Sequence, residues 1–341
     1  MHKYSCEFGL GVYCSYKTIL PAEELNNLIR KDNRYHIYAI LATHKISIKN
    51  AKKYKEGISF ELIKHLGEND ESIRFEKVDI LGLGFDYHKA DIELKYPYSK
   101  INIKFDKKYL KEFYDENIKG KYSIHKSEVL KFKNVTIDSS RLFYMMTYNE
   151  NRKNEMEVLY VGQAYGGNGQ RSAIDRLKSH EKLQKILAEC NIEYPHKRIY
   201  ILLMEMETQL FSAFNGIEKE FEVSEEKSEE HLNEVMSNLP IEKQVINITE
   251  AAIINYFKPK YNNKFVNNFP SVNHGSYRQY YDLDYNKIII ELDMTFNNMP
   301  YLELYTKCNR LTNPFESIQY ILSNDPNRKD MYDIFIEEKN K

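Results

Sequence analysis

A glutamate on an otherwise apolar helix face is the first feature of this sequence that indicates chemistry. Residues 249–264 read Thr-Glu-Ala-Ala-Ile-Ile-Asn-Tyr-Phe-Lys-Pro-Lys-Tyr-Asn-Asn-Lys. At 100° per residue, Glu250 shares a face with Ile254 and Phe257, and we expect that face to be buried. A buried carboxylate requires a cation or hydrogen-bond donors, so Glu250 is a candidate metal ligand or acid–base group. The alternative is structural, because Asn247 and Glu250 have the spacing of a capping box.

A second predicted helix, over residues 173–188, carries an inward cation. Arg176 and His180 lie one turn apart, on the face that also presents two leucines. A single inward histidine is usually a core residue, but burying a guanidinium requires an anion nearby. Either Glu250 or a phosphate group could be that anion, and the sequence leaves both open.

Two short apolar runs precede this helix, at residues 142–148 and 158–163. A polar segment separates them, which predicts a β-hairpin with a long connection. Tyr144 and Tyr160 lie in the two runs, where isolated tyrosines are usually packing residues. The glycine-rich segment that follows ends at Arg171 and lacks the Gly-Lys-Ser/Thr of a phosphate-binding loop. We expect it to connect to the next helix, with Arg171 as a possible phosphate contact.

The order of these residues resembles the GIY-YIG nuclease family, and most closely its restriction-endonuclease branch. Leu142-Phe143-Tyr144 stands where the family has Gly-Ile-Tyr, and Val161 replaces the isoleucine of Tyr-Ile-Gly. The resemblance spans about residues 141–267. Its pieces are Tyr144, Tyr160-Val161-Gly162, Arg176, His180, Glu250 and Asn262.

The resemblance implies phosphodiester hydrolysis with one divalent ion, Mg²⁺ or Mn²⁺, in each active site. Glu250 would hold the ion, which would polarise the scissile phosphate and stabilise the leaving oxygen. Arg176 would neutralise charge on the phosphoryl oxygens. Asn262 would position backbone or phosphate groups.

The resemblance also implies that a tyrosine, Tyr144 or Tyr160, orients or deprotonates the attacking water. The ordinary tyrosine pKa of ~10 is too high for an efficient base at neutral pH, so we expect the site to lower it. Many family members have a lysine after Tyr-Ile-Gly, whereas this chain has Gln163. His180 is the expected substitute, either tuning the tyrosine or acting on the water itself.

The substrate that the resemblance implies is nucleic acid, in the first place double-stranded DNA, in restriction or antiviral (phage) defence. Two alternatives stay open: a non-catalytic module that binds or senses nucleic acid, and an RNA-directed nuclease. The basic residues nearest the motifs are weaker candidates for nucleic-acid contacts. They are Arg171, Lys178, Lys258 and Lys260.

We expect an α+β protein in three parts: an N-terminal α+β domain of unassigned role (1–138), the nuclease-like core (139–267) with a small antiparallel sheet flanked by helices, and a C-terminal extension (268–341). Either outer part could contact a second copy of the chain or a partner protein. In the N-terminal part, the patterns predict helices over 22–30 and 107–117 and strands over 35–42, 92–96 and 101–105. In the extension they predict a hairpin of 288–294 with 301–306, then a helix that begins at Asn313.

Composition limits the class of protein. The chain has 341 residues and a net charge of −1. It contains no apolar run of about 18 residues, no signal-like N-terminus and no cysteine pair typical of a zinc site, so we expect a cytoplasmic protein without a membrane span. Residues 205–245 hold 3 Lys+Arg against 11 Asp+Glu, which marks an acidic insertion at about 216–240 and leaves the remaining core basic. We expect residues 218–234 to emerge near the active-site face and to repel or mimic DNA there.

Overall fold

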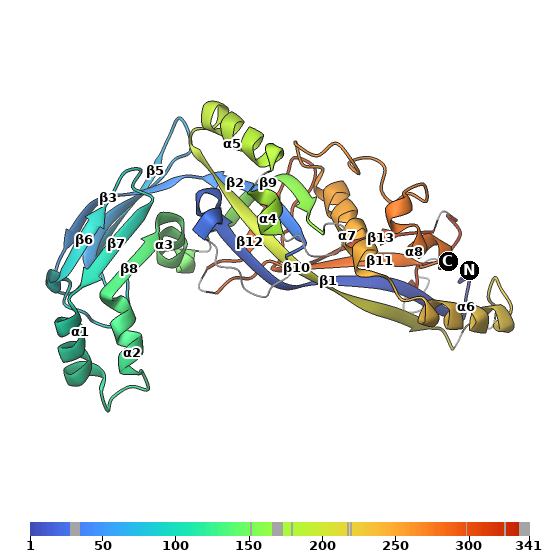
Figure 1. Cartoon of the computed structure of the whole chain (residues 1–341), viewed down its shortest axis with the longest axis horizontal. Helices are drawn as coiled ribbons and strands as arrows, with labels where there is room; N and C mark the ends of the chain where they lie inside the picture. The colour runs from blue at the N-terminus through green and yellow to red at the C-terminus, as the bar shows by residue number, and fades with distance from the viewer. Residues whose placement is uncertain are drawn as a thin grey trace, which may run out of the picture.

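The chain forms two bodies, each built around β-sheet, and together they give an elongated molecule (Figure 1). The computed structural model describes residues 1–27, 35–150, 152–165, 173–178, 180–216, 218, 220–297, 299–323 and 325–333. The structure mixes helices and strands in both bodies, which confirms the α+β class. Within the described residues, no helix combines the length and apolar character needed to cross a bilayer.

The larger body is built on a seven-stranded sheet with the strand order β12-β9-β2-β10-β1-β11-β13. Strand β2 pairs antiparallel with both β9 and β10, and β10 pairs antiparallel with β1. Strand β12 pairs in parallel with β9, and β11 pairs in parallel with β1. Strand β13 pairs antiparallel with β11 at the edge of the sheet. The strands are β1 (Cys6–Pro21), β2 (Ile37–His44), β9 (Asn154–Gln163), β10 (Lys197–Phe214), β11 (Lys287–Asp293), β12 (Leu302–Tyr305) and β13 (Phe315–Ile321).

Helices cover both faces of this sheet, and the apolar sequence of β2 is suited to burial on both sides. Its residues are almost all buried, as expected for a strand packed on two sides. Ile37 and Leu41 belong to the core beneath α7 (Glu242–Phe257), whereas Tyr38 and Ile40 belong to the core beneath α4 (Ala173–Leu177) and α5 (Glu181–Glu193). Because strand side chains alternate, β2 contributes to both cores. Helices α6 (Glu225–Ser237) and α8 (Gln279–Asp282) and the 3₁₀ helix η1 (Ala22–Asn27) complete this body.

The smaller body, called the inserted body below, leaves the large sheet after β2 and returns before β9. Two three-stranded sheets share one apolar core, with the orders β3-β4-β5 and β6-β7-β8. The strands are β3 (Ile46–Lys53), β4 (Ile58–Lys64), β5 (Glu71–Val78), β6 (Ala90–Leu94), β7 (Lys100–Phe105) and β8 (Asn134–Asp138). The helices are α1 (Lys107–Phe113) with a following π turn (Tyr114–Ile118), α2 (Lys126–Val129) and α3 (Ser139–Met146).

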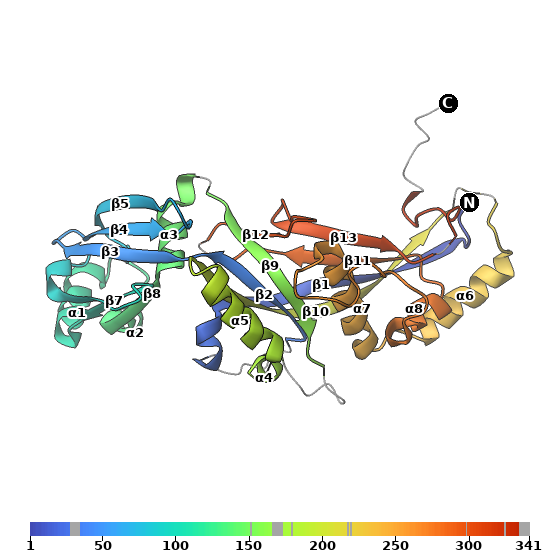
Figure 2. The same cartoon turned by 90° about the horizontal axis from the view of Figure 1, so that it is seen from above.

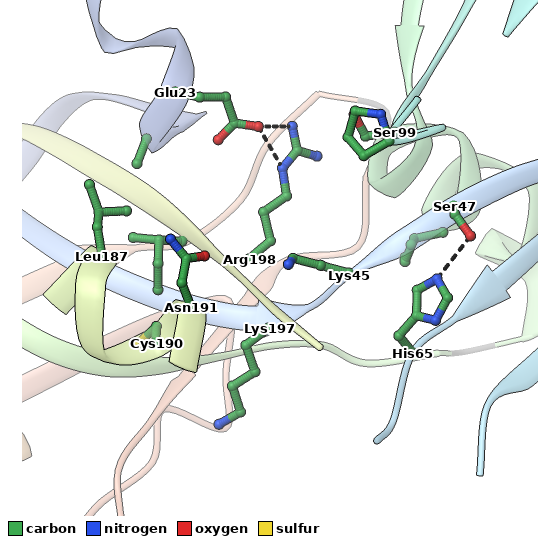
Figure 3. Close-up of a pocket in the computed structure, with 14 residues that line it drawn as sticks. Glu23, Lys45, Ser47, His65, Ser99, Leu187, Cys190, Asn191, Lys197 and Arg198 are labelled. Carbon is green, nitrogen blue, oxygen red and sulfur yellow. Dashed lines mark hydrogen bonds and ion pairs between the residues drawn. The ribbon is translucent and has the colours of Figure 1, made fainter. Parts of the chain in front are cut away.

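A buried arginine ties the two bodies together beside a cavity of about 360 Å³ (Figure 3). Arg198 of β10 lies 2.7 Å from carboxylate oxygens of both Glu23 in η1 and Asp138 at the end of β8. Lys197, which also lines this cavity, pairs with Glu157 at 2.5 Å. Since these cations already have anionic partners, the cavity is a structural junction rather than a site prepared for an anion.

The predicted domain boundary at 138/139 differs from this arrangement, because β1 and β2 belong to the same sheet as β9 and β10. The strand predicted over 142–148 is also wrong. Asp138 caps a helix there by accepting a hydrogen bond from the Ser140 amide, and the apolar residues of α3 pack into the inserted body. A short apolar run does not distinguish a strand from a buried helix by its period.

The C-terminal expectations fail for a related reason. The two predicted strands exist as β11 and β12, but they do not form a hairpin; β11 pairs with β1 and β13, and β12 pairs with β9. The helix predicted from Asn313 is instead β13, whose seven residues all pair with β11. A sheet partner far away in sequence outweighs local capping signals. The helix predicted over 22–30 is a 3₁₀ turn over Ala22–Asn27, and its last three residues lie outside the described part of the chain.

The acidic segment does not emerge near the face that carries the candidate site, so that prediction is wrong. The 13 residue-to-residue steps of β10 from Ile201 to Phe214 span about 43 Å at 3.3 Å per step. The strand therefore leads the segment to the end of the molecule that holds the N-terminus (Figures 1 and 2). There α6 packs on the first residues of the chain, with the His231 ring stacked on Tyr4 at 3.8 Å.

Candidate functional site

One cavity of about 440 Å³ brings together most of the predicted site residues. Tyr160 comes from β9, Arg176 from α4, Glu250 from α7 and Asn262 from the turn after α7. The other lining residues are Gln163, Lys182, Ile254, Tyr261, Asn263, Lys264 and Phe265. Four separate segments of the chain therefore converge on this space.

Glu250 is half-buried in the middle of α7, where no capping role is possible. The helix begins at Glu242 after the N-cap Ile241, so the capping-box alternative fails. Burial raises the pKa of the Glu250 carboxyl from 4.5 to about 7, although hydrogen bonds from Gln163 and the charge of Arg176 act against that shift. The hydrogen bonds and positive charge around Glu250 therefore do not offset the cost of burying its negative charge. A bound cation would offset that cost.

These residues fit a divalent ion that is held by a single carboxylate. Among the described residues, no group of three or more His, Cys, Asp or Glu side chains is placed to hold a metal. Mg²⁺ commonly binds proteins through only one or two carboxylates and takes its other ligands from water and substrate phosphates. Glu250, facing an open cavity, has that character, whereas a closed zinc-type site would need more protein ligands.

Two tyrosines and a histidine form a cluster that adjoins the cavity through Tyr160. Tyr38 of β2 lies with its hydroxyl 3.3 Å from Nε2 of His180, and its ring centre lies 6.2 Å from that of Tyr160. The Tyr160 and His180 ring centres are 5.4 Å apart. Gly162 lies directly opposite Tyr38 in the β2–β9 ladder, and a Cβ atom on it would sit 2.6 Å from the Tyr38 hydroxyl. The glycine is thus required for the close approach of Tyr38.

The electrostatics of this cluster differ from the expectation that the site lowers a tyrosine pKa. Burial is the largest influence on Tyr38 and Tyr160, and it raises the pKa of both phenols. The negative charge of Glu250 raises the pKa of each further, while Arg176 acts in the opposite direction. Both phenols therefore carry their proton at neutral pH and act as hydrogen-bonding groups.

Tyr144, the tyrosine expected to stand in the first signature, is not in the site. It lies on α3 with 2% of its surface exposed, in the core of the inserted body beside Phe143. Tyr38, and not Tyr144, is the tyrosine that packs beside Tyr160. The sequence did contain a signal, because Ile37-Tyr38 matches two residues of the Gly-Ile-Tyr pattern and lies inside the run predicted as a strand over 35–42.

His180 and Arg176 do not share one continuous helix as predicted. Helix α4 ends at Leu177, and His180 is the N-cap residue of α5. The break still leaves both side chains at the site: Arg176 lines the cavity, and His180 is buried against Tyr38.

Asn262 acts on the backbone rather than facing the cavity as a free donor. Its Oδ1 accepts a hydrogen bond from the Val161 amide at 2.9 Å, and its Nδ2 donates to the Val161 carbonyl at 2.8 Å. The Tyr261 amide adds a bond of 3.1 Å to the Leu159 carbonyl. Asn262 is therefore a positioning residue that fixes the turn after α7 against β9.

Of the four basic residues expected to contact nucleic acid, the three that the structure describes, Lys178, Lys258 and Lys260, do not line the cavity. Lys178 and Lys258 are exposed, and Lys258 ends α7 in the left-handed conformation at φ 49°. Lys260 lies 3.8 Å from Glu193 and over the Tyr261 ring. Arg171 lies outside the described residues.

Lys182 and Lys264 line the cavity and were missed. No spacing or motif distinguishes these two lysines among the 49 Lys and Arg residues of the chain. They are the cations that the fold, rather than the sequence pattern, brings to the site.

Comparison with known proteins adds no relative to this description: no family profile, no curated protein and no solved structure matches the chain. The geometry of the site is therefore the basis for the functional argument.

Proposed function

We propose that this protein is a divalent-metal-dependent endonuclease of the GIY-YIG type that hydrolyses phosphodiester bonds, with double-stranded DNA as its substrate. The carrying observation is the convergence of Tyr160, Arg176 and Glu250 on one cavity. Tyr38 and His180 do not line it, but their rings pack against Tyr160. The supporting architecture is the antiparallel trio β9-β2-β10 with α4, α5 and α7 around it. In this reading the inserted body interrupts the two signature strands, and Tyr38 replaces Tyr144 as the first signature tyrosine.

The binding step follows from the charges around the cavity. Glu250 would hold Mg²⁺ or Mn²⁺, and the bound ion would supply Lewis-acid stabilisation of charge on the scissile phosphate. Arg176 presents a planar guanidinium to two phosphoryl oxygens. Lys182 and Lys264 add positive charge at the rim for neighbouring phosphates. Asn262 holds the turn that carries Lys264.

The proton-transfer step follows from the tyrosine cluster. Tyr160 lines the cavity and keeps its proton at neutral pH, so its phenol orients the attacking water rather than ionising. Tyr160 contacts Tyr38, whose hydroxyl lies 3.3 Å from Nε2 of His180. Imidazole is the side chain that exchanges protons near neutral pH. We therefore assign His180 as the group that takes up the water proton through the two phenols, in place of the lysine absent at Gln163.

Incubation with plasmid DNA and with structured RNA, in Mg²⁺ or in EDTA, tests the proposal. We expect metal-dependent cleavage of the plasmid and none by the Glu250→Gln variant, because the amide keeps the shape of the side chain but removes its charge. A thermal-shift titration provides a second measurement: Mg²⁺ or Mn²⁺ should stabilise the parent protein and leave the variant unaffected. Cleavage of RNA alone would favour the RNA-directed alternative, and normal cleavage by Glu250→Gln would refute the assignment of the site.

The two rim lysines allow a matched test of substrate binding. Lys182→Gln and Lys264→Gln should each reduce the slope of log K against log salt concentration by about 0.9, the effect of losing one phosphate contact. Lys185 lies on the same helix as Lys182 but already pairs with Glu189 at 3.4 Å. Lys185→Gln is therefore the control, and an equal effect in all three variants would contradict the rim assignment.

A further inference from the structure

Charge is distributed unevenly along the long axis of the molecule. Residues 104–133, which include α1 and α2, contain nine lysines and five Asp or Glu residues, a surplus of four positive charges. Residues 216–240, which include α6, contain eight glutamates and two lysines, an excess of six negative charges. These segments occupy opposite ends of the molecule (Figures 1 and 2). The net charge of −1 therefore conceals one basic and one acidic end.

The lysines of the basic end divide into paired and unpaired groups. Lys108 and Lys126 lie 3.9 and 3.0 Å from Glu112 and Asp115. Lys111, Lys119 and Lys121 are exposed, and none has a carboxylate at ion-pair distance within the described residues; the Lys121 ammonium donates only to a backbone carbonyl. Unpaired exposed lysines contribute positive potential that internal ion pairs do not cancel.

A groove of about 460 Å³ lies beside these lysines, between the loop at 82–84 and the segment that follows α1. Lys121 and Tyr122 line it, and the Tyr122 side chain is 64% exposed. On the opposite wall, Gly82 and Gly84 adopt φ values of +70° and +72°, and a Cβ on either would meet no atom within 4 Å. One wall therefore offers open backbone at the two glycines beside Leu83, and the other carries the Lys121 ammonium and the Tyr122 phenol. An ammonium, a phenol and accessible backbone are groups that contact a phosphodiester backbone.

We propose that this groove and the three unpaired lysines form a second contact with duplex DNA, away from the scissile phosphate. The inference rests on the proposed nuclease function, because the same substrate would have to reach both the cavity at Glu250 and the inserted body. The acidic end around α6 repels the duplex, so the charge distribution favours an orientation in which DNA lies along the basic half.

Binding measurements with the Glu250→Gln protein test this surface without cleavage. The test variant is Lys111→Gln, Lys119→Gln and Lys121→Gln combined. The control is Lys227→Gln, Lys307→Gln and Lys329→Gln combined, which removes the same charge from exposed lysines outside the inserted body. Each protein is titrated with a duplex of about 10 base pairs, roughly 34 Å long, and with one of about 40 base pairs, roughly 136 Å long.

We expect the test variant to bind the long duplex at least tenfold more weakly at low salt than the control, with a salt slope shallower by up to about 2.7 for three lost contacts. With the short duplex the two variants should agree. Equal affinities of test and control for the long duplex would overturn the second contact, and so would an equal loss on both duplexes. If the unmodified Glu250→Gln protein binds neither duplex at any salt concentration, the proposed nuclease function fails with it.

Discussion

Replacing Glu250 by glutamine should stabilise the protein while it abolishes cleavage. A carboxyl whose pKa is higher in the folded state binds its proton more tightly there than in the unfolded chain, so stability falls as pH rises from about 4.5 to about 7. The difference between a pKa of 4.5 and one of about 7 corresponds to about 3.4 kcal/mol, since a tenfold change in proton affinity is about 1.36 kcal/mol. Because Glu250 remains partly exposed, solvent screening reduces this figure to about 2 kcal/mol.

Glutamine cannot ionise and is free of this penalty. Thermal unfolding in EDTA should therefore give equal midpoints for the two proteins near pH 4.5, and a midpoint higher by about 3 °C for Glu250→Gln at pH 8. Added Mg²⁺ should narrow the gap at pH 8 by stabilising only the parent, because the ion binds only the carboxylate. Glu230→Gln on the exposed part of α6 serves as the control and should show no difference that depends on pH.

A Glu250→Gln protein that is less stable than the parent at pH 8 would contradict this prediction. That result would mean that the carboxylate is well compensated in the folded protein and belongs to the packing of α7. A pH-independent gain would equally contradict it, because the gain would then come from packing and not from the removed charge.

Three further predictions concern the surroundings of the site and the distal end of the sheet. Gly162→Ala should leave the fold intact at a cost of about 1–3 kcal/mol and strongly reduce cleavage, because the new methyl group displaces the Tyr38 hydroxyl; unchanged turnover would remove the tyrosine pair from the mechanism. His180→Ala should lower the rate and change the shape of the pH–rate profile, so an unaltered profile would return His180 to a packing role. Burial acts to raise the pKa of the Asp284 carboxyl, but the hydrogen bond from Lys3 and neighbouring positive charge lower that pKa overall. Asp284→Asn should therefore lower the free energy of unfolding by about 2 kcal/mol at pH 7 and by progressively less below about pH 4. Urea titrations at the two pH values measure this cost, and an equal cost at both would contradict the prediction.

The parts of the site that could be predicted from sequence are those held within one element or by short connections. The inward face of α7 follows from helix periodicity, which places Glu250 with Ile254 and Phe257 irrespective of the remaining fold. Asn262 lies only five residues beyond the end of that helix, so its position near the site could also be predicted from the sequence. The positions of Lys182 and Lys264 could not be predicted, because they line the same cavity only when α5 packs near a turn 82 residues later in the chain.

The wrong placement of Tyr144 has a topological cause that also accounts for the wrong domain boundary. The nearest apolar run upstream of Tyr160 contains Tyr144, at a separation of 16 residues, and local spacing therefore predicts that these two runs pair. In the sheet, β9 pairs instead with β2, and Tyr38 lies opposite Gly162 across an insertion that carries two small sheets of its own. Local patterns carry no information about which of two apolar runs will pair, since the choice is decided by packing between distant segments. Gly162 is the local constraint, because a glycine within a strand indicates that another group approaches the backbone closely. The side chain that occupies this space is Tyr38.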